Sequence, residues 1–240
     1  MWMLALLGGW LRTRYRDPDG EDKTSLNIVV TATLTLLGLV ISFTFSMATN
    51  RYDQRKLYEE QEANASGTEY VRADLLPADR AALVKQLLLQ YLDRRIQFYQ
   101  VDYGSRLVGV DAESTKLQNR LWQAILPEAV SQPTSVTALV LSGMNDVLNS
   151  QGYTQYGWWN RIPRPAWWLL FAIALFANLL VGYATKRTRS GTLLLLVLPV
   201  IVSVSFFLVA DIDSPRGGVI RVLPRNLISL SETLHHGSFQ

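Results

Sequence analysis

The sequence predicts an all-α integral membrane protein with three transmembrane helices, an N-terminal interfacial or partial fourth helix, and an extramembrane antiparallel helical domain. Three stretches of membrane-spanning length carry no charged side chain: Leu26–Thr49, Ala166–Tyr183 and Thr192–Ala210. Runs of about 18 or more apolar residues are typical of spanning helices. Between the first two stretches lies a charged segment of more than 100 residues with helical periodicity.

These patterns divide the chain into five parts. Residues 1–25 are expected to form the N-terminal interfacial segment, and residues 26–49 the first transmembrane helix. Residues 50–163 form the extramembrane helical domain, 164–210 a transmembrane hairpin, and 211–240 a C-terminal tail.

The opening segment, Met1–Leu11, is apolar and ends in basic residues. A signal peptide has the reverse order, with positive residues first. Because indoles favour the membrane interface, Trp2 and Trp10 indicate a helix on the membrane surface, with a short partial fourth span as the alternative.

The first transmembrane helix is expected to continue beyond the membrane to Ser66, with Gly67 as its first breaker. A second helix begins after Pro77 and has a broad apolar surface that requires packing partners on more than one side. A third covers Asp111–Ile125, and Pro127 and Pro133 bracket a short connection. A fourth runs from Thr134 or Ser135 toward Tyr153, which completes the antiparallel domain.

Four indoles and two arginines mark the entry to the second span: Trp158, Trp159, Arg161, Arg164, Trp167 and Trp168. This composition fits a headgroup layer better than a ligand pocket. The third span contains Pro199, where a kink is expected.

The distribution of charge predicts the topology. The net charge of +3 is no signal for nucleic-acid binding. Short loops rich in Lys and Arg stay in the cytoplasm, so Lys186, Arg187 and Arg189 place the turn of the hairpin inside. The N-terminus is then inside, and both the large domain and the tail are outside.

Several classes of function lack their signatures. The chain has no cysteine for disulfide, thiol or thiolate chemistry. It has no phosphate loop, nucleophile elbow or zinc pattern, so we expect neither an enzyme nor a bound metal or cofactor. His235 and His236 lie in a polar terminus expected to be disordered. Asn178 is the one strongly polar side chain of the second span, which argues against a proton-coupled transporter.

One face of the first span is small and hydroxylated. At 100° per residue, six positions fall within one arc: Thr31, Thr35, Gly38, Ser42, Ser46 and Thr49. This stripe is explained by helix packing or by a water-filled ion pathway. Beyond the membrane the same face carries Asp53, Lys56, Glu60, Asn64 and Gly67, which would form rings at a pore mouth in a symmetric oligomer or simply a solvated surface. Glu59, Glu60 and Glu62 are too closely spaced to share one face as metal ligands.

A short motif follows the third span. Pro215, Gly217 and Gly218 indicate a sharp exit in which Asp213 and Arg216 could pair. With Asp211, these residues are interpreted as a structural exit motif.

Four blocks of sequence, in order, resemble the bacterial bestrophin-like membrane family. They are Leu39–Ser46, Glu62–Thr68, Arg72–Pro77 and Asp211–Gly218, and the resemblance covers roughly Leu26 to Leu230. Bestrophins are pentameric anion channels, so the resemblance implies a pentamer, inorganic anions as the conducted species, and a bacterial inner membrane. No particular residues match the acidic calcium-binding clasp of the bestrophins, so calcium is not expected.

Two hypotheses follow. The leading one is a homo-oligomeric ion channel that passes anions, with the first span lining the pore. The alternative is a non-conducting membrane scaffold or sensor that binds a partner through its extramembrane domain. Oligomerisation is expected in both, because three spans are too few to enclose a pathway.

Overall fold

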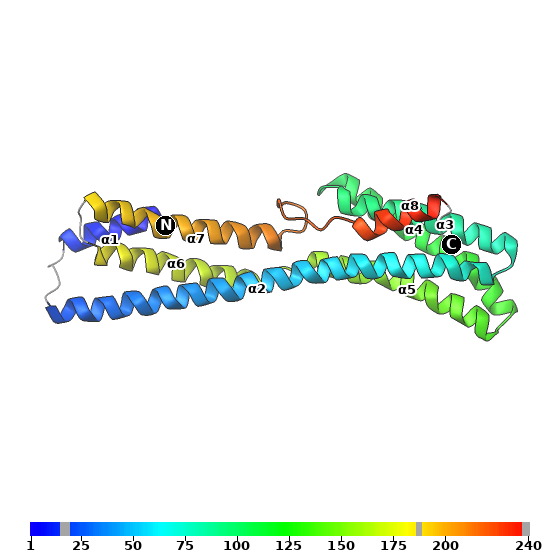
Figure 1. Cartoon of the computed structure of the whole chain (residues 1–240), viewed down its shortest axis with the longest axis horizontal. Coiled ribbons are helices and arrows are strands. Elements are labelled where there is room, and N and C mark those ends of the chain that lie inside the picture. Colours follow the sequence, from blue (N-terminus) through cyan, green and yellow to red (C-terminus); the bar gives the residue numbers. More distant parts are fainter. Residues whose placement is uncertain (15–19, 186–188, 237–240) are drawn as a thin grey trace. The chain divides into compact units, whose positions relative to one another are not determined.

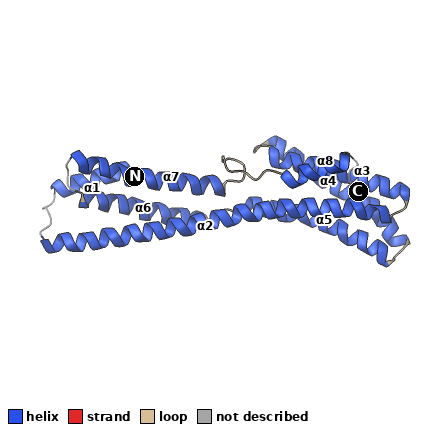
Figure 2. Ribbon diagram, viewed as in Figure 1, coloured by secondary structure: helices blue, strands red, loops and turns tan. Residues whose placement is uncertain are grey.

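The computed structural model describes residues 1–14, 20–185 and 189–236. Every regular element in these ranges is a helix (Figure 2). The chain divides into two compact units. Unit 1 contains residues 1–50 and 161–214, and unit 2 contains residues 51–160 and 215–240.

Unit 1 holds the spanning segments. It contains α1 (Trp2–Arg14), the first part of α2 (Gly20–Arg72), α6 (Arg164–Ala184) and α7 (Arg189–Asp213) (Figure 1). Leu37 of α2, Leu170 and Ala174 of α6, and Val202 and Phe206 of α7 form its buried core. In the described residues, the stretches Lys23–Leu75 and Ser135–Ala184 are long and apolar enough to cross a membrane.

The N-terminal helix α1 packs lengthwise against α6 within this unit. Ala5 and Gly8 are buried, and Arg12 Nη1 donates to the carbonyl oxygen of Ala184 over 2.7 Å. An added Cβ at Gly8 would overlap the backbone of Leu179, and one at Gly182 would overlap that of Ala5. Such close backbone approach is typical of small-residue interfaces between membrane helices. Of the two predicted alternatives, this packing favours the partial fourth helix.

Unit 2 is the helical domain. It contains the second part of α2, the 3₁₀ helix η1 (Ala73–Leu75), α3 (Ala78–Gln100), α4 (Ser105–Ser131), α5 (Ser135–Trp159) and α8 (Arg225–His235). One core joins α3, α4 and α5 through buried side chains that include Leu88, Leu121 and Met144. A second core joins α3 and α5 to α8 through Phe98, Trp158 and Leu227.

Three local predictions are wrong. The connection expected between Pro127 and Pro133 begins later, because α4 continues through Pro127 to Ser131. A proline inside a helix removes one intrahelical hydrogen bond, and only the last turn of α4 follows Pro127. Gly67 does not break α2 but is buried within it, where an added Cβ would lie 3.0 Å from Leu230 Cδ1 of α8.

The third concerns the C-terminus. Residues up to His235 form the amphipathic helix α8, which buries Leu227 and Leu234, where disorder was expected. The hairpin turn that carries Lys186 and Arg187 lies outside the described residues, and so does the side chain of Arg189.

Candidate functional site

The intramembrane part of the predicted stripe lies on the exposed face of α2 in unit 1. Thr31, Thr35, Gly38, Ser42 and Ser46 are exposed, and Thr49 is half-buried. Leu37, Thr44 and Ala48, on the other side of the helix, are buried. The helix therefore packs on its own chain through one face and presents the hydroxylated face outward.

Two hydroxyl groups of the stripe donate to their own helix. Thr35 Oγ1 donates to the carbonyl oxygen of Thr31 over 2.9 Å, and Ser42 Oγ donates to that of Gly38 over 2.8 Å. A hydroxyl has one proton and two lone pairs. With the proton directed at the backbone, each of these oxygens presents lone pairs outward.

The predicted pore-mouth residues lie on the part of α2 that belongs to unit 2. Asp53, Lys56, Glu60 and Asn64 are all exposed. The opposite side of this part of α2 is buried and polar, and it carries Arg55, Glu59, Glu62, Ser66 and Glu69. Gly67, expected in the stripe, is covered by α8.

Sequence reasoning missed the buried polar face of α2 and considered Glu59 and Glu62 only as metal ligands, which it excluded. The Glu62 carboxylate accepts from Arg95 Nε and from Thr154 Oγ1, the latter over 3.0 Å. Arg95 and Glu62 are 1% and 0% exposed, so this ion pair joins α2, α3 and α5 inside the domain. A signal was available, because Glu59, Glu62, Ser66 and Glu69 follow a spacing of three and four in phase with Leu37, Thr44 and Ala48.

Glu59 positions α8. Its Oε1 accepts from the backbone N–H of Leu227 over 3.0 Å, and its Oε2 accepts from Asn226 Nδ2 over 2.6 Å. A carboxylate at a helix N-terminus satisfies donors that have no partner within the helix. Burial raises the pKa of Glu59, although these hydrogen bonds oppose the increase.

The exit motif contributes a cap to each unit. Both carboxylate oxygens of Asp213 accept from the backbone N–H of Ile162 at 3.1 Å, beside the start of α6. Arg216 Nη1 donates to the carbonyl oxygens of Phe98 and Val101, both over 2.6 Å, at the end of α3. Its guanidinium lies 4.1 Å from the centre of the Trp158 ring. Asp211, Asp213 and Arg216 are buried. Pro215 lies between the two capping residues, and Gly217 and Gly218 follow the second one.

In the ranges that the structure describes, no group of three or more His, Asp or Glu side chains is arranged to hold a metal ion. In each unit, α2 has one exposed polar face and an opposite face that is buried against its own chain.

Comparison with known proteins identifies the fold and the family. The family model of the Bestrophin-like domain matches residues 1–227. The chain belongs to the bestrophin-like family. It is a membrane protein of that family, and its helical architecture is the one found in solved bestrophin homologues.

Three structures of a bacterial bestrophin homologue from Klebsiella pneumoniae illustrate the match. One single-substitution variant has a TM-score of 0.71 at 12% identity, covering 100% of this bestrophin-like chain and 98% of that chain. Another variant has a TM-score of 0.70 at 13% identity, with 100% and 96% covered. The structure phased with zinc has a TM-score of 0.67 at 12% identity, with 96% and 97% covered. Among curated proteins, no sequence matches this chain.

Proposed function

We propose that this protein is a homo-oligomeric, non-enzymatic ion channel of the bestrophin type, with the α2 stripe lining its pathway. The observation that carries the proposal is the exposure of the stripe. Four of its intramembrane hydroxyl groups, on Thr31, Thr35, Ser42 and Ser46, are exposed, and its charged continuation is exposed as well. A polar face of a spanning helix is stable when it lines a water-filled cavity or packs on protein, and not when it faces lipid.

Family membership supports a channel of this type in general. The resemblance to bestrophins adds two finer features to the proposal: five copies around an axis, and inorganic anions as the conducted species. We place the oligomer in the bacterial inner membrane as a multi-pass protein. The mass of the detergent-solubilised complex tests the copy number, and a monomer in several mild detergents would contradict the assembly.

A second selectivity, for cations, is favoured by a specific observation. At the mouth, each chain offers the two carboxylates of Asp53 and Glu60 against the single ammonium of Lys56. Rings of acidic side chains favour cations. The outward lone pairs of Thr35 and Ser42 also suit a cation, because an anion requires donors.

Reversal potentials decide between the two selectivities. Purified protein in planar bilayers under a KCl gradient gives unitary currents whose reversal potential lies near the chloride or the potassium equilibrium potential. The double variant Asp53→Asn, Glu60→Gln shifts that potential toward chloride if the mouth contributes to selectivity. Asp79→Asn, an exposed acid at the start of α3, is the matched control and leaves it unchanged. Silence under varied voltage and pH would contradict conduction by this protein.

The stripe itself is tested by Ser42→Leu. In a channel, a leucine ring in the pathway removes most of the conductance while the oligomer survives. If the stripe is only a packing seam, as in a non-conducting scaffold or sensor, the oligomer dissociates first. Conductance and complex mass, measured on the same preparation, separate these outcomes.

A further inference from the structure

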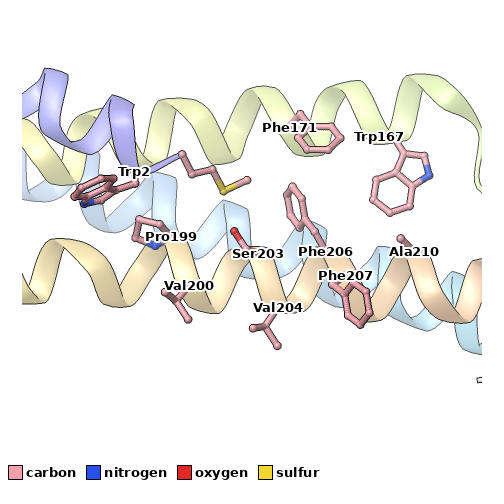
Figure 3. A pocket seen from close by; sticks show the side chains of 11 residues that line it. Trp2, Trp167, Phe171, Pro199, Val200, Ser203, Val204, Phe206, Phe207 and Ala210 are labelled. Carbon is pink, nitrogen blue, oxygen red and sulfur yellow. The ribbon is translucent and has the colours of Figure 1, made fainter. Parts of the chain in front are cut away.

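An apolar groove of about 660 Å³ lies along α7 in unit 1 (Figure 3). Trp167 and Phe171 of α6 line one side, and Phe206 and Phe207 of α7 line the other. Trp2, at the start of α1, lies at the end near Pro199 (Figure 3), and Met1 also lines the groove. Among the lining side chains, Ser203 carries a hydroxyl group and Trp2 and Trp167 carry an indole N–H each, and the others are apolar. Such a groove does not hold water, because water needs two to four polar partners.

The groove has the length of one leaflet of the bilayer. Its lining on α7 extends from Pro199 to Ala210, which corresponds to about 16 Å of helix at 1.5 Å per residue. Half of the hydrocarbon core is about 15 Å thick. The groove therefore fits an extended chain running from the membrane interface to the bilayer centre.

The end of the groove at Trp167 and Ala210 has the composition of a membrane interface. Trp167 is one turn from Arg164, the first residue of α6, whose side chain is exposed. Trp168, beside it, is 74% exposed. Indoles and arginines gather at the level of the lipid headgroups, where a guanidinium attracts a phosphate.

We propose that this groove binds one acyl chain of an anionic phospholipid, whose phosphate group lies near Arg164. The apolar chain replaces the dispersion contacts that the walls would lose if the groove were empty. The aromatic side chains on both walls provide a surface that a flexible chain can follow, and the guanidinium selects the headgroup. This site does not depend on ion conduction.

The probe is phosphatidylglycerol that carries a diazirine in its acyl chain, added to the purified wild-type oligomer in detergent. After irradiation, the cross-linked residues are mapped by mass spectrometry. We expect saturable labelling of groove residues such as Val200 and Val204, with competition by unlabelled phosphatidylglycerol. Equal labelling of Ile201 and Val197, which are 57% and 50% exposed but do not line the groove, would show bulk lipid only and would overturn the proposal.

Three variants test the geometry. Ser203→Phe fills the groove and reduces its labelling several-fold, whereas Ile201→Phe adds the same side chain outside the groove and leaves the labelling unchanged. Arg164→Gln weakens binding by about fivefold, the effect of one arginine near a lipid phosphate. Complex mass verifies that each variant remains assembled.

Two further outcomes count against the site. Equal labelling of the Arg164→Gln variant and the wild type would remove the headgroup contact from the proposal. Disulfide-linked dimers formed by Val204→Cys, with no saturable labelling of the wild-type groove, would show that a second copy covers this surface. The labelling map of the wild-type protein tests the lipid site even if Ser203→Phe fails to fold. A protein that conducts ions normally but shows no labelling of the groove would overturn the lipid site and leave the proposed channel function intact.

Discussion

The Glu62 and Arg95 side chains form an ion pair with almost no exposure to solvent. Each charge is compensated by the other. Removing one partner from a buried pair leaves a charge without compensation, at a cost of about 3 kcal/mol or more. Glu62→Gln should therefore destabilise the helical domain by about 3 kcal/mol. Glu60→Gln, the same change at an exposed position two residues earlier, should change stability by less than about 0.5 kcal/mol. Thermal unfolding of the solubilised protein measures both, and equal effects would contradict the buried network.

Glu69 is a second buried carboxylate, and its protonation should make stability depend on pH. It is 0% exposed, and neither of its oxygens has a hydrogen-bond partner. Burial, with a smaller contribution from Asp146, raises its pKa to about 8, although Arg72 opposes the increase. The folded protein therefore holds a proton that the unfolded chain has already released above its ordinary pKa of 4.5.

The sign follows from this difference in bound protons. Stability contributed by protonated Glu69 is complete below about pH 4.5 and is lost as the pH rises through about 8. Glu69→Gln should remove this loss, so that wild type and variant differ more in unfolding midpoint at pH 9 than at pH 6, with the variant the more stable at pH 9. Parallel profiles for the two proteins between these values would contradict the assignment.

Substitutions at two adjacent glycines of α1, Gly8 and Gly9, should affect the contact between α1 and α6 differently. A methyl group at Gly8 would overlap the backbone of Leu179, so Gly8→Ala must push the two helices apart. At Gly9 the nearest atom is the Gly182 carbonyl oxygen at 3.6 Å, an ordinary contact. We expect Gly8→Ala to destabilise unit 1 by about 1–3 kcal/mol and Gly9→Ala to be tolerated. Limited proteolysis after Arg14, together with thermal unfolding, should show α1 released in the first variant only.

At the level of elements, periodicity predicted the spans and the helices of the large domain, because apolar spacing depends on local sequence. The end of α2 and the burial of Gly67 could not be predicted locally, because Leu230 of α8, which is distant in sequence, covers that glycine. α8 itself was missed because its helical pattern is short and its docking relies on the Glu59 carboxylate, 168 residues away in sequence. The stripe on α2 could be found from sequence alone, because it needs only the 100° rotation per residue.

The buried charges show why the opposite face of α2 was harder to predict. Glu59, Glu62 and Glu69 follow the spacing of a buried helix face, but their charged side chains are of a type usually found on the surface. Composition favours solvent for such residues unless their partners are known. Arg95 and Thr154 are far from Glu62 in sequence, so the pairing became visible only in the folded domain.

The topology of the whole molecule is predicted by its charges. The basic residues of the 186–189 loop, with Arg12 and Arg14 before the first span, predict that the N-terminal side of α2 lies in the cytoplasm. The extramembrane domain is then expected outside. The natural chain has no cysteine, so single cysteines can be labelled without background. Exposed Ala112 of α4 and exposed Thr13 of α1 are suitable positions.

In intact cells, Ala112→Cys should react with an impermeant maleimide, and Thr13→Cys should react only after the membrane is permeabilised. This result would place the mouth residues Asp53 and Glu60 on the outer side of the membrane. The reverse labelling would invert the molecule and put the acidic mouth in the cytoplasm. Because the maleimide reads accessibility rather than current, the test also applies to a protein that does not conduct.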